Sequence, residues 1–176
     1  MDLSHHRDTD SRFDVPLSEI GSDLIQEFHR HWLLLWHDGR LPSRADIDPA
    51  NFRRILPNVI LAEIEADPFR VRYRLCGTRV VEFCGNLTGR YLDQLDGADL
   101  WATSVYTRQY QIAVGERRPV FSYDWMEGAA GGRNFFQTGI WPLARDGAHP
   151  DMCIAVEDYF DLQRADLKAS TDKITR

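Results

Sequence analysis

The apolar positions near the start of the chain recur with the period of an α-helix. Between residues 18 and 38 they fall every three or four positions, which places them on one helical face. A serine at position 18 or 22 is suited to cap the start of the helix, and Gly39 stands where a glycine commonly ends one. The apolar stripe consists of Leu24, Ile25, Phe28, Trp32, Leu35 and Trp36. We therefore predict an N-terminal amphipathic helix of about five turns over residues 18–38.

Five segments further along the chain have the composition of β-strands, because β-branched and aromatic residues dominate them. They cover residues 59–65, 69–77, 119–126, 134–143 and 152–159. The first two are close enough to form a hairpin, and the last three follow one another as a meander. Between the two groups, the period becomes helical again, in short pieces broken by glycines and then in a longer helix over about residues 98–114. A short helix is also expected at residues 49–56, where Pro49 occupies the first position.

The alternation within strand 69–77 predicts which side of that strand is covered. Val71, Tyr73 and Leu75 alternate with three arginines, so we expect these apolar residues to face the interior. In the last three strands, large apolar residues occupy both sets of alternating positions, so both faces of these strands need to be covered. Helices between residues 78 and 114 would cover one face, and the N-terminal helix the other. The predicted fold is therefore α+β, with a five-stranded antiparallel sheet between two helical layers.

Three stretches of the chain resemble a known family. They are GRLPSRADIDPANFRRILPNVIL (39–61), YRLCGTRVVEFCGNLTGRYLDQL (73–95) and GIWPLARDG (139–147). With the order of two strands, a helical crossover and three strands, they resemble a bacterial family of PAS domains that was first catalogued as a domain of unknown function. The resemblance implies a cytosolic sensory or interaction domain, often dimeric, with a cavity between the sheet and the crossover helices. It implies no particular ligand.

The resemblance and the periodicity together give the expected domain organisation. Residues 1–17 are polar and without periodicity, so they are predicted to be a flexible leader. The N-terminal helix follows, and then a PAS-like domain over residues 39–160. Residues 161–176 are expected to be a C-terminal tail. Because nothing after residue 160 is large enough for an output domain, we expect any signal to pass through self-association or through a signalling partner.

Composition and charge exclude several classes of function. A chain of 176 residues with 43% hydrophobic and 27% charged residues is typical of one globular domain. Its net charge of −6 disfavours nucleic acid, and it has no apolar run that resembles a secretory signal or a membrane span. The three cysteines form no CxxC pair, which is typical of reduced thiols. We expect a cytoplasmic protein without a nucleic-acid or membrane partner.

The sequence shows no motif for catalysis or for a cofactor. It contains no GxSxG, HExxH, P-loop or dinucleotide fingerprint. Residues 97–118 contain no histidine, unlike the best-known PAS-type haem sensors, and Cys84 lacks the NCRFLQ-like setting of photoreactive flavin domains. The histidine pair His5 and His6 has no third ligand at fixed spacing, so no metal site is expected. We predict a protein without cofactor or enzymatic activity. A small cavity-containing isomerase or dehydratase remains the alternative, and a perturbed carboxylate or histidine in the cavity would favour it.

One polar residue interrupts an apolar helical face. In the helix at about residues 98–114, Gln109 lies at the centre of a face that also carries Val105 and Tyr106. Its amide either bonds to neighbouring backbone or points into a cavity where a ligand would use it. The predicted ligand-binding residues are Tyr73, Leu75, Trp101, Val105, Tyr106 and Gln109. They would bind a small, largely uncharged molecule. The alternative is a pure interaction module whose core is filled by side chains.

The N-terminal helix carries a wider apolar stripe than packing on one sheet requires. Its largest members predict an interface between two copies of the chain. The predicted dimer interface consists of Phe28, Trp32, Leu35 and Trp36. We therefore expect a homodimer.

Overall fold

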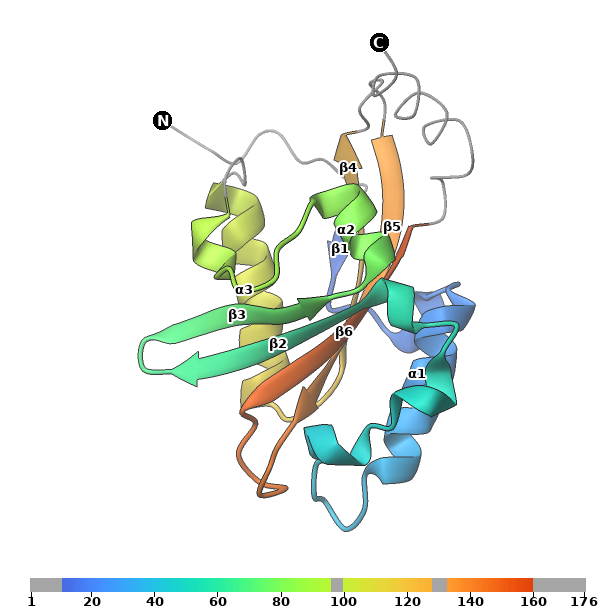
Figure 1. The fold of residues 1–176 in the computed structure, drawn as a ribbon, viewed down its shortest axis with the longest axis vertical. Coiled ribbons are helices and arrows are strands. Elements are labelled where there is room, and N and C mark those ends of the chain that lie inside the picture. The colour runs from blue at the N-terminus through green and yellow to red at the C-terminus, as the bar shows by residue number, and fades with distance from the viewer. Residues whose placement is uncertain (1–10, 96–99, 128–132, 160–176) are drawn as a thin grey trace.

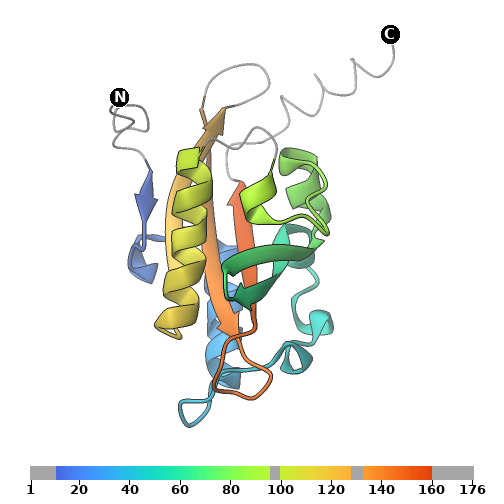
Figure 2. The ribbon, with the colours of Figure 1, turned by 90° about the vertical axis from the view of Figure 1, so that its left-hand side faces the viewer.

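An antiparallel sheet of six strands lies at the centre of the structure, with helices on both faces (Figures 1 and 2). The computed structural model describes residues 11–95, 100–127 and 133–159. The strand order is β1-β4-β5-β6-β2-β3. The strands are β1 (Arg12–Phe13), β2 (Val59–Ala66), β3 (Phe69–Cys76), β4 (Val120–Glu127), β5 (Arg133–Leu143) and β6 (Met152–Tyr159). The α-helices are α1 (Asp23–Leu35), α2 (Thr78–Cys84) and α3 (Leu100–Gly115). The predicted α+β architecture is confirmed.

The sheet contains one strand that the sequence did not predict. Strand β1 lies within the leader expected at residues 1–17, of which residues 1–10 lie outside the described part of the chain. It pairs with the edge of β4, with Arg12 opposite Tyr123 and Phe13 opposite Ser122. The backbone N–H of Val15 also donates to the carbonyl of Phe121 at 2.9 Å. A strand of two residues has no alternation for a sequence pattern to detect, so this part of the leader prediction is wrong.

Helix α1 packs on one face of the sheet through its apolar stripe (Figure 1). Phe28 and Trp32 are fully buried, and the Phe28 ring meets that of Trp141 of β5 edge to face at 4.7 Å. These two residues therefore belong to the core of their own chain, and their assignment to a dimer interface is wrong. Leu35 packs partly buried against the same core, and Trp36 is 36% exposed.

Polar contacts fix the orientation of α1 on the sheet. Ser22 caps the helix, because its hydroxyl accepts from the backbone N–H of Ile25 at 3.2 Å. The same hydroxyl donates to Asp158 of β6 at 2.6 Å, and the Ser22 backbone N–H donates to the side chain of Gln137 at 2.9 Å. The start of α1 is thus tied to two neighbouring strands.

His29 makes the packing of α1 sensitive to pH. Its Nδ1 accepts a hydrogen bond from Nε1 of Trp141 at 3.1 Å, and burial lowers the pKa of His29 below the usual 6.5. Below about pH 6.5, His29 binds a proton more readily in the unfolded chain than in the folded protein. The free energy of unfolding should therefore decrease as the pH falls through this range. Urea unfolding at about pH 7.5 and pH 5.5 tests this. His29→Phe should lose part of the pH dependence and exposed His37→Phe should keep it; identical pH dependence in all three proteins would contradict the assignment.

The short helix predicted at residues 49–56 is replaced by two 3-10 turns, Pro49–Phe52 and Leu56–Asn58. The second turn lies against the end of β3. A Cβ on Gly77 would come within 2.3 Å of the carbonyl oxygen of Pro57, so only glycine fits this position. The Gly77 N–H donates to the carbonyl of Val59 at 2.7 Å.

A register shift in the β2–β3 hairpin changes the face of one predicted site residue. Tyr73 lies opposite Ala62, but Leu75 lies opposite Leu61, so Arg74 is an extra residue in β3. Tyr73 is therefore buried at 6% exposure, as predicted, while Leu75 is 49% exposed. The alternation ends at the extra residue, and the assignment of Leu75 to the cavity is wrong.

Candidate functional site

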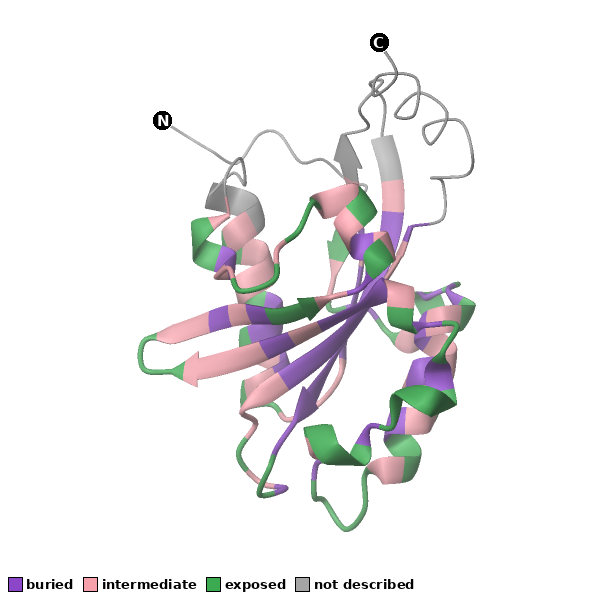
Figure 3. Cartoon of the chain, in the orientation of Figure 1, coloured by how far each residue is buried: buried purple, intermediate pink, exposed green. Residues whose placement is uncertain are grey.

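A row of four residues crosses the sheet on the face that α3 covers (Figure 2). Phe13 of β1 lies opposite Ser122 of β4, which lies opposite Thr138 of β5, and Thr138 lies opposite Glu157 of β6. Directly opposite residues of antiparallel strands project to the same face. Apart from Phe13 the row is polar, and apolar residues lie beside it in the same layer. Strand β6, where the row ends, is largely buried (Figure 3).

Helix α3 packs over this face with Gln109 turned into the protein. Tyr106, one turn before it, donates from its hydroxyl to Asp124 of β4 at 2.7 Å. Tyr110 and Ala113 are buried in the core beneath the helix. Gln109 lies between Tyr106 and Tyr110 along the helix and is 2% exposed.

Two polar side chains in this layer are buried without a hydrogen-bond partner. Among the described residues, neither the nitrogen nor the oxygen of the Gln109 carboxamide has one, and the hydroxyl of Thr138 has none either. Buried polar atoms in folded proteins are almost always paired, and an unpaired one costs about 1–3 kcal/mol. The sequence left two interpretations open for the Gln109 carboxamide, a hydrogen bond to neighbouring backbone or a position in a cavity. The hydrogen bond to backbone is not observed among the described residues.

An open groove of about 350 Å³ runs along α3 at the edge of this layer. One side is α3, and the other is the N-terminal segment that contains β1. The groove is lined by Phe13, Asp14, Ser104, Val105, Arg108, Gln109 and Ile112. Phe13, Val105 and Ile112 make its surface largely apolar, and Gln109 is the most deeply buried of the lining residues.

Two carboxyl groups lie on the same face of the sheet. Asp124 is 1% exposed and accepts hydrogen bonds from Tyr106, from Ser11 and from the backbone of Trp125. Glu157 accepts one from Tyr159, and burial raises the pKa of Glu157. Because both groups disfavour a nearby negative charge, this face suits a neutral ligand better than an anion.

The Cys84 thiol also lies on this face, 3.5 Å from the hydroxyl of Tyr159. Burial, together with the nearby charge of Glu157, raises the pKa of Cys84 to about 12. The thiol is therefore protonated at neutral pH, and a protonated thiol is a poor nucleophile. We assign Cys84 a packing role.

The structure brings together some of the predicted site residues and separates others. Val105 and Gln109 line the groove, while Tyr106 lies beside it and holds Asp124. Tyr73 is on the predicted face but is buried against Tyr110, away from the groove lining. The side chain of Trp101 lies outside the described residues.

Sequence reasoning missed the second wall of the groove and the polar row. Phe13 and Asp14 lie in a segment without any periodic signal. Thr138 and Ser122 lie in strands that the sequence predicted correctly. Because side chains alternate between the two faces of a strand, their positions would have placed them on the face that α3 covers. The groove itself lies at the edge of the layer, between α3 and the N-terminal segment, whereas the sequence predicted a cavity between the crossover helix and the inner face of the sheet.

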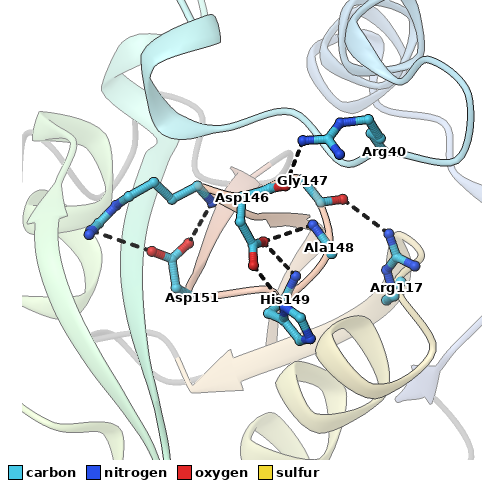
Figure 4. Close-up of polar contacts among 8 residues, drawn as sticks. Arg40, Arg117, Asp146, Gly147, Ala148, His149 and Asp151 are labelled. Atoms are coloured by element: carbon cyan, nitrogen blue, oxygen red, sulfur yellow. Dashed lines mark hydrogen bonds and ion pairs between the residues drawn. The ribbon is translucent and has the colours of Figure 1, made fainter.

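A separate polar cluster fixes the far end of α3 (Figure 4). Arg117 donates from Nη2 to the carbonyl of Gly39 at 2.9 Å and to the carbonyl of Gly147 at 3.1 Å. Arg40 donates to the carbonyl of Asp146 at 2.6 Å in the same turn. The cluster joins the end of α3 to the turn after α1 and to the β5–β6 turn, so we assign it a structural role.

Comparison with protein families decides the classification. A family model described as a PAS domain matches residues 22–115, just over half of the 176-residue chain. The chain belongs to the PAS domain family. PAS domains are generally sensory modules. In the described part of this PAS domain, no helix is long and apolar enough to cross a membrane, and no three potential metal ligands lie together.

The solved structures that match the chain include light-oxygen-voltage domains. One, studied with a flavin analogue, is 11% identical; the alignment covers 72% of this chain and 94% of that one, with a TM-score of 0.47. The light-oxygen-voltage protein of Rhodobacter sphaeroides is 14% identical, with 70% and 74% covered and a TM-score of 0.43. Light-state Aureochrome1 is 11% identical, with 72% and 98% covered and a TM-score of 0.43. No curated protein matches the chain.

Proposed function

We propose that this PAS domain senses a small, largely uncharged molecule that binds in the groove between α3 and the N-terminal segment. The observation that carries the proposal is the Gln109 carboxamide, which is buried in the wall of the groove without a hydrogen-bond partner among the described residues. A ligand that supplied those hydrogen bonds would remove a cost that the protein carries alone.

The shape and chemistry of the groove define the ligand class. A volume of about 350 Å³ is at the lower end of the range for small-molecule sites. A carboxamide presents a donor and an acceptor side by side, so its natural partner has an acceptor and a donor in the same arrangement. The apolar surface of Phe13, Val105 and Ile112 would hold the remainder of the ligand.

The geometry favours sensing over the two alternatives. A pure interaction module would have its polar core groups paired within the chain, but Gln109 and Thr138 have no such partner among the described residues. Glu157 is a perturbed carboxylate of the kind an isomerase or dehydratase would use. However, it lies at the opposite end of the row from Phe13 and the groove, and it is held by Tyr159.

Self-association or a partner would carry the signal onward. The exposed apolar residues at the end of α1 are the candidates for that contact, and they are Leu33, Leu34 and Trp36. They replace Phe28 and Trp32 as the proposed contact surface, because those two are inaccessible.

Replacing Gln109 by leucine tests the proposal. The probe is 2-pyridone, an uncharged lactam whose N–H and C=O are adjacent, and binding is followed by changes in the NMR signals of the Gln109 side-chain amide. We expect saturable binding to the wild-type protein. Gln109→Leu keeps the volume but loses the hydrogen bonds, so the affinity should fall at least about fivefold, the equivalent of one bond of about 1 kcal/mol.

Benzene is the matched control probe, because it fills apolar space without a hydrogen bond. Its affinity should be equal in the two proteins or higher in Gln109→Leu. If 2-pyridone fails to perturb the Gln109 amide, or binds Gln109→Leu as tightly as the wild type, this site does not bind the proposed class of ligand.

A further inference from the structure

We infer that Arg108 makes the groove selective for a ligand that carries a single carboxylate, with this group at the mouth of the groove and the uncharged end of the ligand at Gln109. This inference rests on the proposed function and narrows the chemical class of its ligand. The observation behind it is that Arg108 lines the groove and has neither a hydrogen bond nor an ion pair with another described residue.

Helix α3 presents Gln109 and Arg108 at different depths of the groove. Neighbouring residues of a helix point about 100° apart. Accordingly, Gln109 is buried at 2% exposure, while Arg108 is exposed. Ser104, one turn before Arg108, is also exposed and lines the groove. The groove therefore extends from a buried carboxamide to an exposed guanidinium, so a ligand bound to Gln109 has its outer end near Arg108.

The groove is lined by two charged side chains, Asp14 and Arg108, and only Asp14 is paired within the described part of the chain. The two carboxylate oxygens of Asp14 accept hydrogen bonds from Nη1 and Nη2 of Arg118, at 2.7 and 2.8 Å. This contact with Arg118 lowers the pKa of Asp14. The negative charge of Asp14 is thus balanced by Arg118, and the donors of Arg108 remain available to a ligand.

The chemistry of Arg108 suits a carboxylate. A planar guanidinium presents paired N–H donors that match the two oxygens of a carboxylate, and this geometry is more specific than a point charge. Because Arg108 is exposed, water competes for it, so we expect it to contribute selectivity more than overall affinity.

The opposite end of the ligand has to be uncharged. The carboxyl groups of Asp124 and Glu157 lie on the sheet face beneath α3, and Asp124 is bound to Tyr106, one turn before Gln109. A negative charge placed at Gln109 would be repelled by these groups. The two ends of the groove therefore favour different chemistry, with a neutral amide edge inside and an anion at the mouth.

Two probes that differ in one charge test the inference. The first, 6-oxo-1,6-dihydropyridine-3-carboxylate, has the amide edge of 2-pyridone and a carboxylate on the opposite side of the ring. The second is its 3-carboxamide, which has the same shape without the charge. At pH 7 and low salt, the carboxylate should bind the wild-type protein about three- to tenfold more tightly, the range between an exposed ion pair and a charge-assisted hydrogen bond. Binding is followed through the NMR signals of the Gln109 side-chain amide.

Arg108→Gln should bring the ratio of the two affinities to about one, and Arg108→Lys should keep part of it. Arg53→Gln is the matched control, because Arg53 is also exposed but follows the 3-10 turn that packs on the α1 side of the sheet. It makes the same change in net charge and should keep the full ratio. About 0.5 M NaCl should reduce the ratio in the wild type, since salt screens exposed charges.

Equal affinity of the wild type for the two probes would overturn the inference and leave the binding site standing. A preference for the carboxylate that persists in Arg108→Gln, or that is unchanged by salt, would do the same. If neither probe perturbs the Gln109 amide, the proposed function fails together with the inference.

Discussion

Replacing Tyr73 by aspartate is expected to leave the protein largely unfolded. Tyr73 is 6% exposed in the core beneath α3, where its neighbours include Val71 and Tyr110. A carboxylate at this position would be buried without a cationic partner and would also leave space that the ring now fills. The combined cost of more than about 4 kcal/mol is comparable to the whole stability of a domain of this size. Circular dichroism and urea unfolding would measure it.

Tyr73→Phe separates the packing of the ring from the contribution of its hydroxyl. Phenylalanine keeps the apolar contacts and loses only the polar interaction of the hydroxyl with Tyr110, so its cost should be about 1 kcal/mol. If Tyr73→Asp melts within a degree or two of the wild type, the inner face of β3 has been assigned to the wrong residues.

Phe28→Ala should lower the free energy of unfolding by about 3–5 kcal/mol. The Phe28 ring is fully buried between α1 and the sheet and has edge-to-face contacts with Phe52 at 5.4 Å and with Trp141 at 4.7 Å. Removing it leaves a cavity that the rigid neighbouring rings cannot fill. Because the contact is within one chain, the loss should not depend on protein concentration.

Leu34→Ala on the same helix is the matched control. Leu34 is 70% exposed, so its removal should change stability by less than about 0.5 kcal/mol in the monomer. A loss at Phe28 that disappears at high protein concentration would return this residue to the dimer interface that the sequence predicted.

The sequence predicted the layers of the fold because periodicity records which side of an element is covered. The apolar stripe of α1 and the two-sided strands 119–126 and 134–143 required a cover on both faces, and the structure has it. Periodicity does not say what the cover is. A helix that packs on its own sheet and a helix that packs on a second chain have the same spacing of apolar residues. The burial of Phe28 and Trp32 within one chain shows that they pack on the sheet.

The candidate site was predicted in part. Gln109 was found because a polar residue within an apolar helical stripe is a local signal. Leu75 was misassigned because one extra residue in β3, Arg74, reverses the face of the residue after it. The sequence pattern of the strand does not indicate this extra residue. Phe13 and Asp14 reach the groove only through long-range pairing with β4, which no local pattern encodes.

A crystal structure of the protein soaked in 2-pyridone tests the central claim most directly. We expect the ring in the groove between Phe13 and Val105, with its N–H and C=O within about 2.8–3.1 Å of the Gln109 carboxamide. A groove without 2-pyridone, in which Gln109 is hydrogen-bonded to Thr138 or to backbone, would contradict it.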